Sequence, residues 1–203
     1  MVDKICNYIL KKMQKKIPEI TEEQSEIIAY GLKLIIGEIP KTLFLFVLAF
    51  VLGVGWYMVF AYVAIMPYRV ASGGLHLHTH LGCIISSAIM YYGNIFLSKY
   101  LYIADVQKYI IVGLTFIFGI LMISWYAPAD TENVPIISKK ERKTKKIISY
   151  ITFTLTLIVA ILISDNTLSN ILIFGTIIQT IMITRIAYKL TNNKYGHEVY
   201  ANQ

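Results

Sequence analysis

The stretch TLFLFVLAFVLGVGWYMVFAYVAIM, residues 42–66, decides the class of fold. It contains no Asp, Glu, Lys or Arg, and the next charged residue is Arg69. A helix that crosses the hydrocarbon core of a bilayer needs roughly 20 mostly apolar residues. Such a segment must be helical in lipid, because every backbone N–H and C=O group has to find its partner within the protein. We therefore expect an all-α, polytopic integral membrane protein with a span in residues 42–69.

The composition of the whole chain agrees with this class. Of the 203 residues, 56% are hydrophobic and 15% are charged, against about 25% charged in soluble domains. This hydrophobicity excludes a disordered chain, and a soluble globule of this length cannot bury so much apolar surface. The two cysteines, Cys6 and Cys83, are too few for a disulfide framework. The formal charge of +7 is expected to face the cytoplasm and the lipid headgroups, with no nucleic acid as partner.

Further apolar runs predict about six transmembrane helices. Residues 81–97, 109–129, 147–164 and 166–184 are four further runs free of Asp, Glu, Lys and Arg. A weaker candidate, EIIAYGLKLIIG at residues 26–37, is short and contains Lys33. The chain is thus expected to form a single domain, residues 1–203, with a transmembrane bundle at residues 22–189 and a tail at residues 190–203.

The basic residues predict the orientation of the bundle. Residues 138–146, SKKERKTKK, carry six positive charges and one negative charge, and residues 1–16 carry five lysines. Because basic loops stay on the inner face of a membrane, six spans place both of these segments and the tail in the cytoplasm. Counting back two spans from residues 138–146 returns the chain to the cytoplasmic side near residues 67–80.

Residues 1–20 form a segment of their own ahead of the spans. Ile5, Tyr8, Ile9, Met13 and Ile17 recur at helical spacing among lysines. This pattern predicts an amphipathic helix that lies on an anionic membrane surface. A solvated basic tail is the alternative.

The segment PYRVASGGLHLHTHLGC, residues 67–83, contains three of the four histidines, one of the two cysteines and an arginine, so it is the candidate functional site. It allows three interpretations. In the first it is a plain turn, in which Pro67 ends a helix and Cys83 is a small hydrophobic residue. In the second, His76, His78, His80 and Cys83 bind a metal such as zinc. The alternating histidines suit a strand better than a helix, however, and no acidic residue occurs between Glu38 and Asp105.

In the third interpretation Cys83 is a nucleophile and a histidine is its base. In one straight helix His76 would lie roughly 10.5 Å along the axis from Cys83, so the pair requires a break in the helix. Gly73 and Gly74 favour a loop there, and Thr79 is a suitable N-cap for a helix that carries Cys83 in its first turns. The helix dipole would then stabilise the thiolate. A single helix through residues 72–90 would count against this interpretation.

Supporting residues are also available. Arg69 could stabilise an oxyanion or bind a substrate carboxylate, or it could anchor the chain at the membrane interface. Ser72 and Ser86 could touch the site or could pack helices together. Because no carboxylate is close in sequence, a Cys–His dyad is expected rather than a triad.

The string Arg69-x-x-x-Gly73-Gly74-x-His76, followed by Cys83, resembles the accessory gene regulator protein B (AgrB) family of Gram-positive quorum sensing. The chain length, the basic segment before the last two spans and residues 26–32 (EIIAYGL) are similar as well. The resemblance implies a multi-pass cell-membrane cysteine endopeptidase with His76 and Cys83 as its catalytic pair. It implies no cofactor and no metal, and it places Arg69, Gly73 and Gly74 at motif positions.

The same resemblance implies the substrate and the assembly. The substrate would be a small AgrD-like propeptide, which is cut between a cysteine-containing core and an acidic tail and becomes a cyclic thiolactone or lactone. A homodimer is implied as well. Two other classes stay open: a small transporter that binds metal through its histidines, and a membrane scaffold without catalysis.

Overall fold

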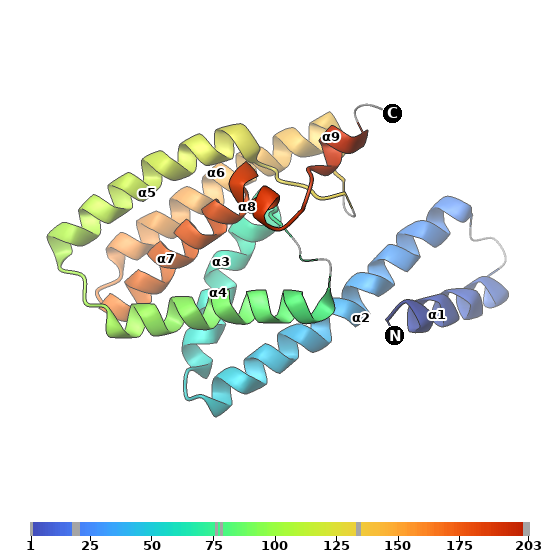
Figure 1. Cartoon of the computed structure of the whole chain (residues 1–203), viewed down its shortest axis with the longest axis horizontal. Coiled ribbons are helices and arrows are strands. Elements are labelled where there is room, and N and C mark those ends of the chain that lie inside the picture. The colour runs from blue at the N-terminus through green and yellow to red at the C-terminus, as the bar shows by residue number, and fades with distance from the viewer. Residues whose placement is uncertain (1, 18–20, 76, 78, 133–134, 201–203) are drawn as a thin grey trace. The chain divides into compact units, whose positions relative to one another are not determined.

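The computed structural model describes residues 2–17, 21–75, 77, 79–132 and 135–200 (Figure 1). These residues form nine helices and no strand. The helices are α1 (Val2–Lys16), α2 (Glu22–Val51), α3 (Gly55–Ser72), α4 (His80–Tyr100), α5 (Asp105–Tyr126), α6 (Lys139–Leu162), α7 (Asn166–Met182), α8 (Arg185–Leu190) and α9 (Gly196–Tyr200). They fall into two compact units, residues 1–52 and 53–203, and each unit is described by itself.

The first unit is a pair of packed helices. The predicted N-terminal helix is confirmed as α1, which packs against α2. Gln14 Nε2 donates to Ser25 Oγ at 2.8 Å between them, and Cys6 is fully buried. Tyr8 of the predicted apolar face is 66% exposed. Contact of α1 with a membrane surface stays a prediction.

The prediction of one span in residues 42–69 is wrong. The first part of this run belongs to α2, a helix of 30 residues that also contains the weaker candidate at residues 26–37. The helix ends at Val51, and α3 begins only at Gly55. Between them Gly53 adopts a φ of +71°, which side chains with a Cβ rarely tolerate. Glycine is uncharged, so a search for charge-free runs passes over this break.

Pro67 does not end a helix, as the plain-turn interpretation expected, because it lies inside α3. The helix continues to Ser72 and ends where Gly73 adopts a φ of +73°. The helix boundary is therefore set by glycine rather than by proline.

The second unit is a bundle in which α4 to α7 run back and forth, each opposite to the one before, and α3 crosses them (Figure 1). The central helix is α7, which contacts α3, α4, α5 and α6. Its neighbours α5 and α6 approach closely at Gly119, where an added Cβ would lie 2.0 Å from the Phe153 ring. The core thus gathers around α7 and the inner faces of its neighbours.

Three described helical segments are long and apolar enough to cross a membrane: Leu81–Tyr100 in α4, Asp105–Tyr126 and Lys139–Leu162. The central helix α7 is also apolar but has 17 residues. These features are those of a membrane protein with an all-helical fold. The count of six spans and the cytoplasmic position of the termini stay predictions.

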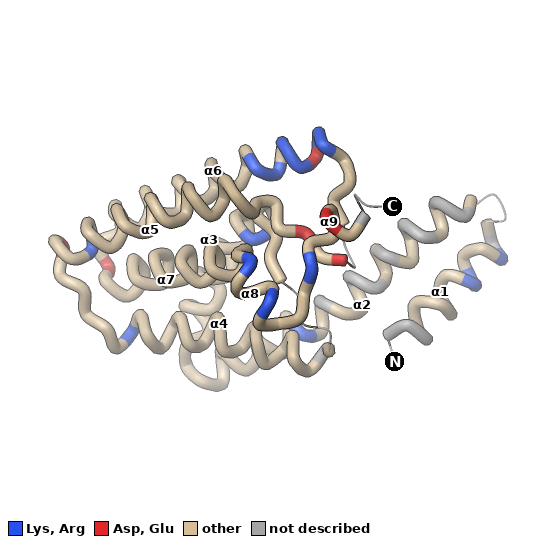
Figure 2. Tube along the Cα trace, turned by 45° about the horizontal axis from the view of Figure 1, so that its top comes forward, with Lys and Arg blue, Asp and Glu red and all other residues tan. Residues whose placement is uncertain are grey.

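One end of this bundle, hereafter the Gly73 end, brings together segments that are distant in sequence. Gly74 N donates to Ala129 O at 2.9 Å, and Ala129 N donates to Ser72 O at 2.8 Å. The lysines and arginines of α6 lie in its first turns (Figure 2), and Arg142 Nη2 donates to Pro128 O at 3.3 Å. The loop after α3 and the basic segment therefore share one end, as counting spans predicted. The side of the membrane that this end faces stays a prediction.

Candidate active site

The predicted break between the two helices of the motif is confirmed. After Ser72 the described residues leave the helix, and α4 begins at His80. Thr79 is its N-cap, as predicted: Thr79 Oγ1 accepts a hydrogen bond from Gly82 N at 3.1 Å. Cys83 N donates to Thr79 O at 2.9 Å, so Cys83 lies in the first turn of α4. Its backbone is thereby fixed at the start of a regular helix.

Gly73 occupies a position that only glycine fits. Its φ of +73° and ψ of −147° belong to a region that is essentially restricted to glycine. A Cβ built there would lie 2.2 Å from Ala129 O. Its neighbour Gly74 has a φ of +137° and donates to the same carbonyl oxygen. The glycine pair lets the loop lie directly against the chain that follows α5.

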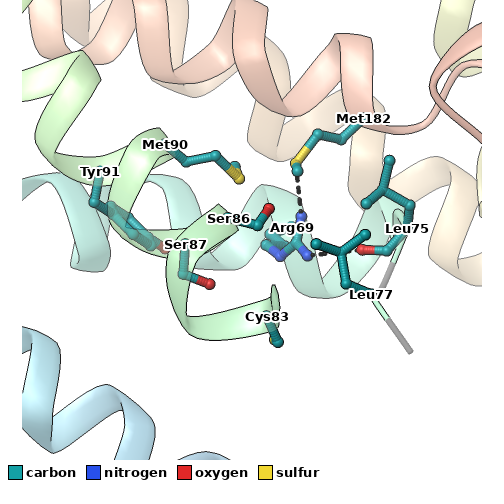
Figure 3. A pocket seen from close by; sticks show the side chains of 9 residues that line it. All are labelled: Arg69, Leu75, Leu77, Cys83, Ser86, Ser87, Met90, Tyr91 and Met182. Carbon is teal, nitrogen blue, oxygen red and sulfur yellow. Dashed lines mark hydrogen bonds between the residues drawn. The ribbon is translucent and has the colours of Figure 1, made fainter. Parts of the chain in front are cut away.

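Cys83, Arg69 and Ser86 are among the residues that line a small cavity of about 30 Å³ (Figure 3). This volume admits ordered water but no peptide side chain. The lining residues come from α3, the loop, α4 and α7: Arg69, Leu75, Leu77, Cys83, Ser86, Ser87, Met90, Tyr91 and Met182. Arg69 and Cys83 are both partly buried. The thiol of Cys83 and the guanidinium of Arg69 thus line the same small cavity, together with apolar side chains.

Arg69 is held from several directions. Its Nη1 donates to Gln179 Oε1 at 2.8 Å and to Met182 Sδ at 3.4 Å, and its Nη2 donates to Leu75 O at 3.3 Å. The residue at this position is therefore bound to α7 and to the loop. These bonds are not those of a cation that only anchors the chain at a lipid interface.

Gln179 is the residue of the site that sequence reasoning missed. It is fully buried, and its Nε2 donates to Ser72 Oγ at 2.9 Å and to Gly73 O at 2.8 Å. Ser72 and Gly73 therefore lie on the side of the loop that faces α7 and do not line the cavity. The sequence does contain a sign of it, because Gln179 is an amide within the apolar run of residues 166–184. A polar side chain in such a run is expected to be buried and to have hydrogen-bond partners.

A carboxylate also comes to the Gly73 end, through Asp130 next to Ala129. Its Oδ1 lies 2.6 Å from His197 Nδ1, and its Oδ2 accepts from Ile136 N at 2.9 Å. Burial raises the pKa of Asp130, but the hydrogen bonds from His197 and Ile136 and the nearby positive charges outweigh burial and lower the pKa from its ordinary value. Asp130 thus bonds to His197 in the C-terminal tail and pairs with Arg142 of α6 at 3.4 Å, and it does not line the cavity.

The histidines that were predicted as a catalytic base or as metal ligands cannot be located, because the structure does not describe their side chains. His76 and His78 lie among the residues that are not described, and the same is true of the side chain of His80. Among the described side chains, no group of three or more His, Cys, Asp or Glu is close enough to hold a metal ion. The roles of His76 as a base and of the three histidines as metal ligands stay predictions.

Comparison with known proteins identifies the family. Residues 2–183 match the family model described as Accessory gene regulator B. The chain belongs to the AgrB family. This match includes every residue around the cavity, from Arg69 to Met182, whereas α8 and α9 follow it. The motif resemblance is therefore confirmed over nearly the whole chain.

Relatives in several bacteria support this assignment. An AgrB-like protein of Listeria monocytogenes is 29% identical over 174 residues, which cover 85% of this chain and 83% of the relative. An AgrB-like protein of Clostridium acetobutylicum is 25% identical, with 96% and 91% covered. Accessory gene regulator protein B of Staphylococcus epidermidis is 22% identical, with 97% of each chain covered. No solved structure matches the chain.

Proposed function

We propose that this protein is a membrane-embedded cysteine endopeptidase of a quorum-sensing system. Its substrate would be a small AgrD-like propeptide, from which it removes the C-terminal tail. The observation that carries the proposal is that Cys83 and Arg69 line the same small cavity in a chain of the AgrB family. The thiol lies in the first turn of α4, where the positive end of the helix dipole stabilises a negative charge.

In the first step the sulfur of Cys83 attacks the carbonyl carbon of the scissile peptide bond. The thiol proton passes to His76, and His76 then gives it to the leaving amine. The C–N bond breaks, the acidic tail departs with a free amino terminus, and the peptide core stays bound to Cys83 as a thioester. No cofactor takes part in this balance.

In the second step the thiol of a cysteine in the substrate attacks this thioester. One thioester forms as the other breaks, and the proton of the substrate thiol returns to Cys83, so the exchange is nearly balanced in energy. A hydroxyl in place of the thiol would yield a lactone. Because both groups belong to one bound peptide, the attack is effectively intramolecular, and such proximity can supply about 7–11 kcal/mol in the best cases.

The described neighbours of Cys83 have roles in this scheme. The guanidinium of Arg69 is a fixed cation at the cavity and is suited to stabilise the oxyanion that forms during attack. Ser86 lies on α4 beside the same cavity. The basic first turns of α6, at the same end of the bundle, would attract the acidic tail over a range that salt shortens. This end would face the cytoplasm.

Co-expression with a propeptide tests the proposal. The propeptide should combine an amphipathic leader, a cysteine-containing core and an acidic tail, with an epitope on the tail to report cleavage. We expect cleavage by the parent protein and none by Cys83→Ala. Cys6→Ala is the matched control, because Cys6 is the other cysteine and lies in the first unit. A covalent enzyme–peptide adduct that a thiol reagent releases would identify the thioester.

Histidine variants separate the proposal from its alternatives. We expect His76→Ala to lose cleavage and His78→Ala and His80→Ala to keep it. Equal dependence on all three histidines together with a requirement for added zinc would support the metal-binding class instead. Unchanged cleavage by Cys83→Ala would overturn the proposed mechanism.

A further inference from the structure

We propose that Gln179 of α7 is a positioning residue for the reaction at Cys83. Its side-chain amide would hold Arg69 and the loop that begins at Gly73 in one fixed arrangement. This inference rests on the proposed function, and it concerns a residue that does not itself line the cavity but bonds to Arg69, which does. It joins the last turns of α7 to the end of α3.

The amide of Gln179 is used at both ends. Oε1 accepts a hydrogen bond of 2.8 Å from the guanidinium of Arg69, which is a charge-assisted bond. Nε2 donates to Ser72 Oγ at 2.9 Å and to Gly73 O at 2.8 Å. Rotating the amide by half a turn would set its NH₂ group against the guanidinium and its oxygen against the Gly73 carbonyl. The observed orientation of the amide therefore makes all three hydrogen bonds, whereas the rotated orientation would have two repulsive contacts.

The same turn of α7 holds the loop at a second point. Leu75 N donates to Met182 O at 3.4 Å, and Met182 Sδ accepts from Arg69 at 3.4 Å. Gly74 is packed so closely that an added Cβ would lie 3.3 Å from Arg69 Nη1 and 3.6 Å from Gln179 Nε2. The loop from Gly73 to Leu75 thus rests directly on Gln179 and Met182.

The contact between the loop and α7 affects the proposed reaction because the loop adjoins both Cys83 and His76. Leu75 lines the cavity beside Cys83 and immediately precedes His76 in the chain. Arg69, the cation of the cavity, donates hydrogen bonds to Gln179 Oε1, Met182 Sδ and Leu75 O. One buried amide therefore sets the position of the cation and of the backbone that leads to the proposed base.

A filler of the α3–α7 interface would behave differently from a positioning residue. Methionine has nearly the length and volume of glutamine but lacks both hydrogen-bonding groups. Glutamate keeps an acceptor for Arg69 but has no donor for Gly73 O and Ser72 Oγ when ionised. If Gln179 only fills space, Gln179→Met is the mildest change. If it positions the site, Gln179→Met is the more harmful of the two.

The test measures cleavage kinetics of these variants in membranes together with their thermal unfolding in detergent. For Gln179→Met we expect kcat to fall about 10- to 100-fold, since small misplacements near reacting groups cost this much. We expect KM to change less than about threefold, because ground-state binding is left in place. Gln179→Glu should retain more of the parental kcat than Gln179→Met.

Thr180→Val is the matched control. Thr180 adjoins Gln179, is equally buried, and its Oγ1 lies 3.0 Å from Tyr68 Oη of α3. The variant breaks a buried bond between the same two helices without touching Arg69 or the loop. We expect its unfolding temperature to fall as that of Gln179→Met does, with kcat unchanged.

A second readout needs no substrate and separates this inference from the proposed function. In a Cys6→Ala background, the rate at which a neutral maleimide alkylates Cys83 is measured at one pH. We expect this rate to differ from the parental rate in Gln179→Met, because the residues around Cys83 are displaced, and to match it in Thr180→Val. A folded Gln179→Met with parental kcat and a parental alkylation rate would overturn the inference and leave the proposed function untouched. If the parent cleaves no propeptide, the proposed function fails, and the alkylation rates still show whether Gln179 positions the residues around Cys83.

Discussion

Replacing Gly73 with alanine should detach the loop that precedes His76 from the rest of the Gly73 end. The added Cβ would lie 2.2 Å from Ala129 O, which is far inside van der Waals contact. The backbone conformation itself, with φ of +73° and ψ of −147°, costs a residue other than glycine about 1–3 kcal/mol. The loop cannot keep both its conformation and its distance from Ala129.

The size of the destabilisation in Gly73→Ala follows from the hydrogen bonds that the displaced loop would lose. Moving the loop away from Ala129 breaks the bonds from Gly74 N to Ala129 O and from Ala129 N to Ser72 O. Each contributes about 0.5–1.5 kcal/mol net. With the conformational cost, the attached loop is destabilised by roughly 2–6 kcal/mol. Because about 1.4 kcal/mol is a factor of ten, we expect cleavage to fall by at least about tenfold.

The assay compares propeptide cleavage in membrane vesicles with thermal unfolding in detergent. Gly93→Ala and Gly113→Ala are the controls, since a Cβ at either position meets nothing within 4 Å. Both are helical, so alanine there should stabilise by about 0.5–1 kcal/mol. Parental cleavage and a parental unfolding temperature in Gly73→Ala would refute the reasoning.

Other predictions concern the packing and the tail. Gly119→Ala should destabilise the bundle by about 1–3 kcal/mol through a clash with the buried Phe153 ring, seen as a lower unfolding temperature than that of Gly113→Ala. Because the folded-state pKa of Asp130 is lowered, the stability that it contributes is present above the unfolded value of about 3.9 and is lost as pH falls through the folded value. Unfolding temperatures between about pH 6 and 3 should show this loss in the parent and not in Asp130→Asn. His197→Ala should cost about 1–3 kcal/mol at neutral pH by removing a partner of a buried carboxylate, and parental stability would contradict this. Asn170→Leu, at the opposite end, should lower the unfolding temperature by removing bonds to Leu101 O and Asn166 Oδ1 while leaving kcat unchanged.

Local features of the site could be predicted from the sequence because they depend on residues close together in the chain. The glycine pair ends α3, and Thr79 caps α4 through its own backbone neighbours. The position of Cys83 in the first turn follows from that cap. The boundary at Gly53 was missed because hydrophobicity alone does not distinguish a long span from two helices joined by a glycine turn.

The partners of the loop could not be predicted, because they come from distant parts of the chain. Nothing near Gly73 in sequence indicates that its carbonyl bonds to Gln179 or that Gly74 bonds to Ala129. Asp130 illustrates the same limit: no acidic residue adjoins the motif in sequence, yet helix packing brings one to the same end. Its engagement with His197 in the tail depends on tertiary structure alone.

The central position of α7 has a consequence for how the protein is made. Arg69 and its partner Gln179 are 110 residues apart in the chain, and at about 5–20 residues per second their synthesis is separated by about 5–20 s. During this interval the thiol of Cys83 is already present, but the helix that completes its surroundings has not been made. Cys83 and Arg69 are therefore synthesised well before Gln179, and the cavity that they line is completed only when α7 has been made. A nascent chain that stalls before α7 would carry the cysteine but not the assembled site.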